Sequence, residues 1–538
     1  MNEVNSEPTD SRSGGEPHRR ARWHTIAEFV LLMLLIFAYA GDAAPMVNEA
    51  HYLVKAKSFW DPAWCANDLF VASTKAHTSF YGIFGWPTRF VSLSATAWIG
   101  RLVAWSLLAL GLQRLCWTVF GRGWLSLIVA LMWIAGVEYG NLAGEWVVGG
   151  IEAKVPAYGL ILFAMADMSI RRWNRVWLWL GAASALHVLS GGWSVIAAIV
   201  SWTVTERKRE NRVPLISGWL FAGGAIALFG LVPAVALTLG TSPEASTAAA
   251  RIYSYYRIRH HLLPADFLPH WYLRHGILIL ATCIFGRRCV PIETRLQPLA
   301  GFTLGAVGIA GIGMIVGLLP AFAPDLAAKL LRFYWFRLTD AIVPLMFAML
   351  IAALLIDNAR NWSRIGLACC ALALVLVSVS TFERIRRGVP PSVSNVLLGR
   401  DTGASRQTQL QVMRDWLAVC RWARLSSPQD AVFLTPRHQQ TFKWYAHRAE
   451  VVNWKDVPQD AASLGEWNRR FLEIYPQRLG FVRVTIQYDK LREYRREYGA
   501  RMMIVDRRVT GQNLPLVRLY PTNGEVNTTY AVYELPQD

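Results

Sequence analysis

The sequence lacks the cysteine pairs that a disulfide framework or a structural zinc site requires. Its seven cysteines are scattered over 538 residues, without the spacing typical of a disulfide framework or a zinc site. We also find no internal repeat, direct or inverted, of the kind that many transporters contain.

Acidic residues are few relative to basic ones. The chain has 37 Asp and Glu against 55 Lys and Arg, a formal net charge of +18. Much of the basic excess lies in short loops between apolar runs, where it indicates membrane topology and contact with anionic lipid headgroups. We therefore expect membrane lipids as partners and no nucleic acid.

Long apolar runs are what the sequence has in abundance. Hydrophobic residues make up 54% of it, and many runs are roughly 18 to 25 residues long, the length that crosses a ~30 Å hydrocarbon core. We predict an α-helical polytopic membrane protein of about eleven spans with a C-terminal soluble α/β domain. The predicted spans are 25–40, 92–118, 124–140, 151–169, two short helices within 176–204 that turn at Gly191-Gly192, 214–240, 272–286, 298–320, 337–356 and 365–381.

The arrangement of charged segments predicts the topology. Residues 1–24 form a polar tail predicted to be disordered and cytoplasmic, because basic residues directly precede the first span. That span is predicted to be a retained signal anchor. Eleven crossings then place the C-terminal domain outside the cytoplasmic (inner) membrane, together with the outer loops 41–90, 241–271 and 321–336.

The composition changes after the transmembrane region, which we place at 25–381. Residues 382–404 have the Arg, Pro, Ser and Gly content of a linker. In the predicted domain, 405–538, helical and strand patterns alternate, which favours an α/β fold. The predicted helices are 407–424, 460–475 and 488–498, and the strand candidates are 431–435, 451–452, 502–505, 516–520 and 530–535.

The first outer loop is the most informative stretch for function. Asp42 and Glu49 lie within ten residues of the first span, and Asp68 follows. A partly desolvated carboxylate at such a place has a raised pKa and can act as a general base. The alternative is a solvated loop whose charges have no catalytic role.

Two later segments combine cations with aromatic residues. The first, RIYSYYRIRHH, begins at Arg251, and the second, RFYWFR, begins at Arg332 and ends at Arg337. Guanidinium groups suit phosphate oxygens, although an interfacial helix on anionic lipid is an equal alternative. Adjacent histidines such as His260 and His261 rarely reach one ion together, so we predict no metal ligands and no cofactor, with a divalent metal left open.

Charged residues also flank the fourth span. Glu145, Glu152 and Lys154 lie at its predicted outer end, where ionisable groups are functional candidates. Glu152 and Lys154 are two residues apart and would not face each other on a helix. We therefore expect each of them to meet other partners.

The segment Asn48-Glu49-Ala50-His51-Tyr52 resembles the Asp-Glu-x-x-Tyr motif of the GT-C superfamily of polyprenyl-phosphate-sugar-dependent glycosyltransferases, with Asn48 in place of the first acid. The span count and the exported domain fit the same resemblance. The segments VNEAHYL, GGIEAKVPAYG, HHLLPADF, RFYWFRLTD and AEVVNWKDVPQDA are also similar to an uncharacterised bacterial multi-pass family.

The GT-C resemblance implies transfer of a sugar from a polyprenyl-phosphate-linked donor to a glycan, lipid or protein acceptor on the outer face. Glu49 matches the motif's glutamate and would be the general base, with Asp42 as the next candidate. The residues that would bind substrate are His51, Tyr52, Asp68, Arg251, Arg257, Arg259, His260, His261, Arg332 and Arg337.

Two other functions are compatible with a multi-span chain. One is a non-enzymatic transporter or flippase for a lipid-linked or polar solute, which predicts charges at mid-span depth and a repeat relating two halves. The sequence shows neither feature. The other is an envelope-assembly protein, for which eleven spans would be an excessive anchor.

Overall fold

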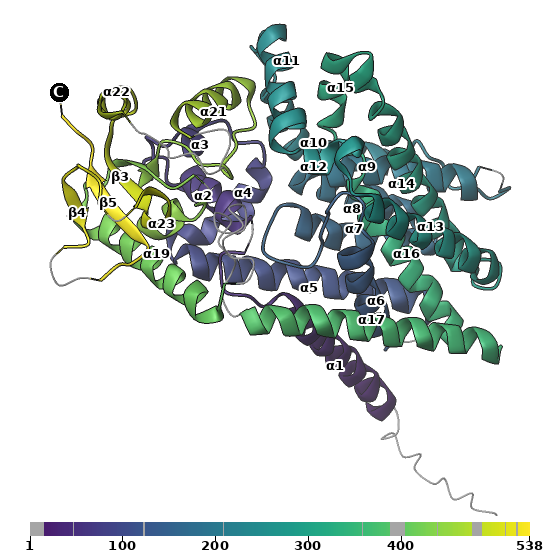
Figure 1. Cartoon of the computed structure of the whole chain (residues 1–538). Helices are drawn as coiled ribbons and strands as arrows, with labels where there is room; N and C mark the ends of the chain where they lie inside the picture. Colours follow the sequence, from purple (N-terminus) through teal and green to yellow (C-terminus); the bar gives the residue numbers. More distant parts are fainter. Residues whose placement is uncertain are drawn as a thin grey trace, which may run out of the picture.

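A bundle of long helices and a small α/β domain at one end of it make up the molecule (Figure 1). The computed structural model describes residues 15–46, 48–121, 124–207, 209–357, 359–387, 404–437, 439–475, 487–511, 513–522 and 526–537. The predicted linker 382–404 lies largely outside the described residues.

The bundle confirms the predicted α-helical membrane class. Within the described residues, seven helical stretches are long and apolar enough to cross a membrane, namely 23–40, 93–120, 188–205, 218–236, 294–321, 337–356 and 360–386. The count of eleven crossings stays a prediction. The long helices are α1 (Gly15–Ala40), α5 (Leu93–Phe120), α6 (Leu125–Gly140), α7 (Lys154–Ser169), α8 (Trp173–Leu186), α9 (Val188–Thr205), α10 (Gly218–Ala236), α13 (Pro269–Cys289), α14 (Gln297–Val316), α16 (Arg337–Ile356) and α17 (Arg360–Arg387).

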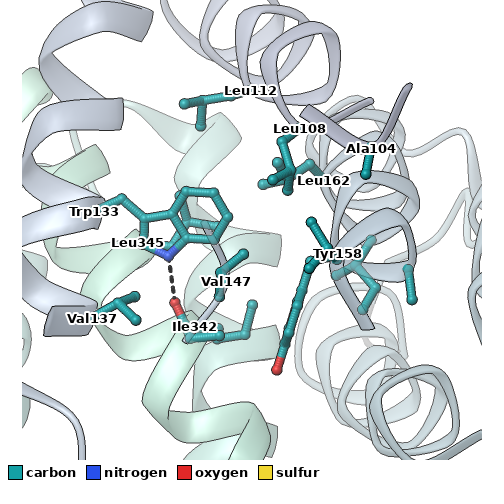
Figure 2. Close-up of a cluster of buried hydrophobic side chains, with 14 of the residues drawn as sticks. Ala104, Leu108, Leu112, Trp133, Val137, Val147, Tyr158, Leu162, Ile342 and Leu345 are labelled. Atoms are coloured by element: carbon teal, nitrogen blue, oxygen red, sulfur yellow. Dashed lines mark hydrogen bonds between the residues drawn. The ribbon is translucent and has the colours of Figure 1, made fainter. Parts of the chain in front are cut away.

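The helices differ in how much apolar surface they expose. Helix α16 is buried along almost its whole length, whereas α10 and α17 expose many large apolar side chains. Exposed apolar faces of this kind suit lipid contact. At the core, side chains of α5, α6, α7 and α16 interdigitate, and the indole N–H of Trp133 donates to the carbonyl of Ala341 at 2.8 Å (Figure 2).

The predicted turn at Gly191-Gly192 is wrong, because the chain breaks earlier, at His187. Both glycines lie inside α9, and His187 caps that helix by accepting the backbone N–H of Ser190. Gly191 instead allows close packing, since a Cβ there would meet the Cα of Ser184 on α8 at 2.3 Å. The glycine is required by helix–helix contact and not by a turn.

Replacing Gly191 by Ala is therefore expected to destabilise the bundle by about 1–3 kcal/mol, the usual cost of overpacking. Gly192→Ala is the matched control, because a Cβ at that position meets nothing within 4 Å. It should be neutral or slightly stabilising, since Ala is the better helix former. Thermal unfolding in detergent would compare the two variants, and an equal melting temperature for both would contradict the packing role.

The segments predicted as outer loops are largely helical. Between α1 and α5 lie α2 (Glu49–Trp60), α3 (Leu69–Ala72), α4 (Thr78–Gly85) and η1 (Trp86–Arg89). Between α10 and α13 lie α11 (Pro243–Arg251), the π-helical turn η2 (Ile252–Arg257), α12 (Arg259–Leu262) and η3 (Pro264–Asp266). The turn η4 (Thr294–Leu296) precedes α14, and η5 (Leu319–Ala321) and α15 (Pro324–Leu331) follow it.

The C-terminal domain has a mixed five-stranded sheet in the order β2-β1-β3-β5-β4. Strand β1 pairs in parallel with β2 and β3, and the other pairs are antiparallel. The strands are β1 (Val432–Leu434), β2 (Ala449–Glu450), β3 (Ala500–Asp506), β4 (Arg518–Tyr520) and β5 (Tyr530–Glu534). The predicted strand 451–452 therefore begins two residues too late.

Helices cover both faces of this sheet. One face packs on α19 (Arg406–Ser426) and α20 (Phe442–Ala446), and the other on α21 (Ala461–Ile474) and α22 (Tyr488–Tyr498). The short α23 (Arg507–Thr510) follows β3. Strand side chains alternate between the two cores: Val432 and Leu434 face α21, while Phe433 faces α19. The predicted α/β domain is confirmed.

The C-terminal domain lies at the end of the bundle opposite to the start of α1. Near that start, Glu28 accepts a hydrogen bond at 3.0 Å from Gln113 in the second half of α5. The last turns of α5 therefore lie beside the first turns of α1. At the other end, Arg384 near the end of α17 pairs with Asp42 just after α1, at 2.7 Å. We call this second end the domain-facing end. Its location outside the inner membrane stays a prediction.

Candidate active site

Charged side chains gather at the domain-facing end of the bundle. They come from the connection between α6 and α7, from the starts of α7 and α16, from η2 and from the loop after β2. Glu145, Glu152, Lys154, Arg257, Arg337 and Lys455 form this group, which we call the polar cluster. Four cations against two carboxylates leave an excess of two positive charges.

Glu145 joins two cations of the polar cluster. Its Oε1 lies 3.2 Å from Nζ of Lys154, and its Oε2 lies 3.0 Å from Nε of Arg337. Lys154 also lies 3.7 Å from Oε2 of Glu152, so the expectation that Glu152 and Lys154 do not meet is wrong. Glu152 precedes α7, and helical spacing does not apply to it.

Asp340 holds the connection that carries Glu145. It lies one turn into α16 and is fully buried, and its carboxylate accepts the backbone N–H groups of Leu142 and Ala143 at 2.7 and 2.9 Å. The N–H of Glu145 adds a longer contact at 3.4 Å. Three backbone donors on one carboxylate fix the course of the connection.

Oε1 of Glu145 and Oε1 of Glu152 both lack a hydrogen-bond partner among the described residues, but that of Glu145 lies 3.2 Å from the ammonium of Lys154. Glu152 therefore has the freer carboxylate of the polar cluster. It is buried, and its Oε1 has no hydrogen-bond partner in the described part of the chain. Burial raises the pKa of Glu152, although Lys154 and a hydrogen bond with Asn48 oppose the shift. A desolvated carboxylate with a raised pKa and a free oxygen is suited to accept a proton.

Arg257 and Lys455 are the cations with spare capacity. Among the described residues, no carboxylate lies within ion-pairing distance of either. Arg257 donates through Nε to the carbonyl of Trp454 at 2.8 Å, and its guanidinium lies over the indole ring of the same residue. Burial and the charge of Arg257 lower the pKa of Lys455 to about 8. Desolvated cations with unused donors attract an anionic oxygen.

A second place for an oxygen lies between His187 and Arg337. The imidazole of His187 accepts the N–H of Ser190 at Nδ1, so its single proton is on Nε2. Nη1 of Arg337, which is also a donor, lies 3.1 Å from that Nε2. Two buried donors therefore face each other, and an acceptor oxygen beside them would satisfy both.

Tyrosines line the polar cluster. The hydroxyl groups of Tyr253 and Tyr334 lie 2.9 Å apart, and the guanidinium of Arg337 stacks on Tyr334 at 4.1 Å. Tyr52 packs against His77, and burial together with the charge of Glu152 raises the pKa of Tyr52 well above its usual value. These rings add polar edges and apolar faces next to the charges.

The structure brings several of the predicted substrate-binding residues together. Tyr52, Arg257 and Arg337 belong to the polar cluster or contact it, and Arg332 stacks on Tyr253 at 5.5 Å. His261 is close by, because its Nδ1 lies 2.5 Å from the carbonyl of Ala143.

Other predicted residues lie elsewhere. Arg251 pairs with Asp325 and Arg259 pairs with Asp266, and both arginines are exposed. His260 is exposed, but it borders the polar cluster, because burial and the charges of Arg257 and Lys455 lower its pKa. The remaining two, His51 and Asp68, belong to a buried network on the C-terminal domain, which is described below.

Glu49 is fully buried and fully engaged. Its two oxygens accept Nε and Nη2 of Arg101, each at 2.6 Å, and the backbone N–H groups of Met46 and Ile151 at 2.7 and 2.8 Å. The role of general base predicted for Glu49 stays untested, but this geometry favours a positioning role. Ile151 directly precedes Glu152, so Glu49 holds the segment that carries the freer carboxylate.

Asp42 is the other predicted base. It is partly exposed and pairs with Arg384 at 2.7 Å, while its carbonyl accepts Nη1 of Arg101. Asp42 therefore joins α1, α5 and α17, and its assignment as a base also stays a prediction.

Among the described residues, one group has side-chain oxygens close enough together to hold a metal ion. It consists of Glu473, Glu493 and Glu497 on the C-terminal domain.

Residues 414–474 match a domain family of unknown function, DUF6798. This stretch runs from α19 to α21 and includes Lys455. No curated protein matches the chain.

The chain is also similar to the crystal structure of ArnT from Cupriavidus metallidurans bound to undecaprenyl phosphate. The two are 14% identical, and the match covers 96% of this chain and 98% of that chain with a TM-score of 0.34. A TM-score this low supports no argument about this chain.

Proposed function

We propose that this protein is a GT-C-like glycosyltransferase that moves a sugar from a polyprenyl-phosphate-linked donor to an acceptor hydroxyl. The observation that carries the proposal is Glu152, a buried carboxylate with an unpartnered oxygen, close to the spare cation Lys455, which in turn adjoins Arg257. A base beside a phosphate-binding group, at the end of membrane helices, suits a reaction on a lipid-linked phosphate.

Each group has a role in the transfer. Glu152 accepts the proton of the acceptor hydroxyl as that oxygen bonds to the anomeric carbon. The bond from the anomeric carbon to the phosphate oxygen breaks, and its electrons remain on the lipid phosphate, which gains a negative charge. Arg257 and Lys455 stabilise this charge as it develops.

The remaining groups orient the substrate. The paired donors of His187 and Arg337 hold a substrate oxygen, and Glu145 keeps Arg337 and Lys154 in place. Holding the reacting atoms in position lowers the barrier in addition to acid–base catalysis. The acceptor is a glycan, lipid or protein carrying a hydroxyl group.

Binding of a lipid phosphate is the first test of the proposal. Native mass spectrometry of the purified protein should detect bound undecaprenyl phosphate, and Arg257→Gln should weaken its retention about tenfold or more, because a charge-assisted contact is lost. Arg259→Gln is the matched control, since that side chain is exposed and already paired with Asp266. Equal retention by the two variants would refute the assignment of Arg257.

A further inference from the structure

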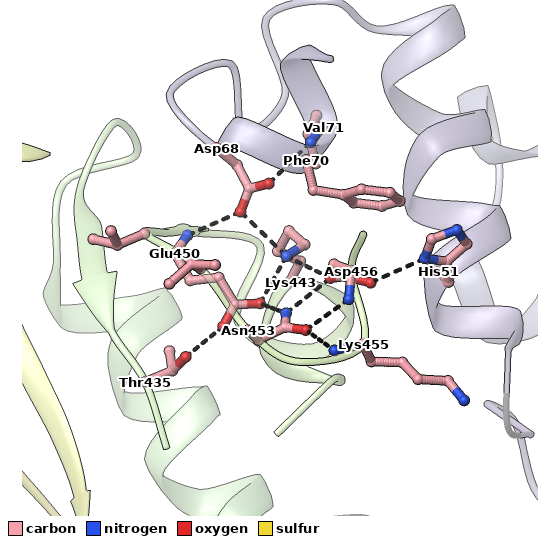
Figure 3. A network of polar contacts seen from close by, with 12 residues as sticks. His51, Asp68, Phe70, Val71, Thr435, Lys443, Glu450, Asn453, Lys455 and Asp456 are labelled. Atoms are coloured by element: carbon pink, nitrogen blue, oxygen red, sulfur yellow. Dashed lines mark hydrogen bonds and ion pairs between the residues drawn. The ribbon is translucent and has the colours of Figure 1, made fainter. Parts of the chain in front are cut away.

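A buried ion network joins the C-terminal domain to the segment after α1 (Figure 3). At its centre is Lys443, which is 1% exposed. Nζ of Lys443 lies 2.7 Å from Oε1 of Glu450, 2.7 Å from Oδ2 of Asp456 and 3.2 Å from Oδ2 of Asp68. Such a buried cation is tolerated only because carboxylates surround it.

Besides the ion pair of Asp68 with Lys443, two further contacts of this network cross between the domain and the bundle side. Asp68, which caps α3, accepts the backbone N–H of Glu450 at 3.1 Å. Asp456 lies 3.4 Å from Nδ1 of His51 on α2. Although burial opposes ionisation, the Lys443 ammonium holds the pKa of Asp456 below its usual range. Asp456 is thus a fixed negative charge at the junction.

The loop between these contacts is held rigidly. Oδ1 of Asn453 accepts the backbone N–H groups of Lys455 and Asp456, each at 2.8 Å. The amide of Asn453 donates to Glu450 at 2.6 Å and to Asp456 at 2.9 Å. The backbone on both sides of Lys455 is therefore fixed by the network.

The side chain of Lys455 points away from the network (Figure 3). It is close enough to Glu152 that each charge shifts the pKa of the other. Arg257 from η2 contacts the same loop, because its Nε donates to the carbonyl of Trp454 at 2.8 Å. The other charged or titratable groups near Lys455 are Lys154 from α7, Asp456 from its own loop, His51 from α2 and His260 from α12. The loop thus reaches from the domain into the polar cluster.

We infer that the C-terminal domain completes the lipid-phosphate site: Lys455 contacts the phosphate, and Lys443, Asn453 and Asp456 are positioning residues that hold it there. This inference rests on the proposed function and assigns a role to the segment 414–474, whose matching family has no known one. The domain is then part of the catalytic unit and not a separate binding module.

The test uses the full chain in nanodiscs and reads Lys455 directly. Acetylation of individual lysines is followed by mass spectrometry at pH 8, with and without undecaprenyl phosphate. Lys455 should be acetylated readily and be protected severalfold by the lipid phosphate. Asp456→Asn should remove most of that protection. Glu466→Gln should leave it intact, because Glu466 is a half-buried carboxylate on α21 in the same matched segment that pairs with Arg469 and Arg470, outside the network.

Two variants outside the network cover the case in which Asp456→Asn fails to fold. Lys455→Met should raise the KM for the donor about tenfold or more, and Lys455→Arg should restore it. In the wild type, kcat/KM should fall as the pH rises through about 8, because Lys455 loses its charge; in Lys455→Arg this decline should move to higher pH.

The outcomes separate the two proposals. The inference about the domain would be overturned if lipid phosphate did not protect Lys455 from acetylation. It would also be overturned if a folded Asp456→Asn variant kept full protection. An unchanged KM in Lys455→Met with normal sugar transfer would also overturn it, and the transferase function would stand with Arg257 alone as its phosphate-binding cation. Protection of Lys455 by lipid phosphate without any sugar transfer would support the inference and contradict the transferase function.

Discussion

Glu152→Gln is expected to reduce the rate of sugar transfer by about 10²–10⁴-fold, the usual contribution of a general base. Glutamine keeps the size of the side chain, but it cannot take up the proton of the acceptor. Because Oε1 of Glu152 has no hydrogen-bond partner in the described structure and Lys154 keeps its shorter ion pair with Glu145, the change should leave the melting temperature nearly unchanged. Transfer of radiolabelled sugar in nanodiscs would measure the loss.

The pH profile distinguishes a base from a merely structural carboxylate. Burial raises the pKa of Glu152, and the base must be ionised to act. In the wild type, kcat/KM should therefore fall as the pH decreases through a value above the ordinary glutamate pKa. This acidic decline should be absent from the residual activity of Glu152→Gln.

Asp42→Asn is the control for that experiment. The Asp42 carboxylate is partly exposed and pairs with Arg384, so its loss should change the transfer rate only modestly. If Asp42→Asn abolished transfer in a folded protein while Glu152→Gln remained active, the base would be Asp42 and the assignment of Glu152 would be wrong.

Glu49→Gln is expected to destabilise the protein by about 3–5 kcal/mol, because it leaves the buried guanidinium of Arg101 without its counter-charge. Glu49 and Arg101 are both fully buried and share two short hydrogen bonds. Two backbone N–H groups would also lose a charged acceptor. Thermal unfolding in detergent should show a clear fall in melting temperature.

Glu138→Gln is the matched control for Glu49→Gln. Glu138 lies on α6, is exposed and accepts one side-chain hydrogen bond, from Tyr39. The melting temperature of the Glu138→Gln protein should therefore change little. A Glu49→Gln variant of normal stability that has lost sugar transfer would contradict the positioning role. It would instead support the role of general base that the GT-C motif implies.

The sequence predicted the helices well because spanning helices must be long and continuously apolar. It placed the break between α8 and α9 wrongly, since a glycine that permits close helix contact looks the same in a sequence as a glycine in a turn. Gly191 faces Ser184 across the two helices, and that neighbour cannot be inferred from local sequence.

The site was only partly predictable for a similar reason. The arginine-rich segment suggested phosphate binding, but the sequence does not distinguish Arg257 from Arg259. In the structure Arg257 is buried at the end of η2, whereas Arg259, at the start of α12, is exposed. Lys455 comes from a loop far along the chain, and only the folded domain brings it to Glu152. Asp340 is a missed residue that the sequence does signal, because an acidic residue one turn into a predicted span is a functional candidate.

The motif acid shows a further limit of the sequence. A carboxylate just after a span can be a base or half of a buried ion pair, and the difference depends on its partner. For Glu49 that partner is Arg101, which lies within a long apolar run of α5. Its pairing with the carboxylate was not visible in the sequence.

The central claim is sugar transfer from a lipid phosphate, and the most direct measurement is made on the reconstituted wild-type protein. Nanodiscs containing the protein, a polyprenyl-phosphate-linked radiolabelled sugar and an envelope extract as acceptor should yield labelled acceptor and free polyprenyl phosphate in equal amounts. Vesicles that accumulate a solute without donor, and that release no polyprenyl phosphate when donor is present, would contradict the account and favour a transporter.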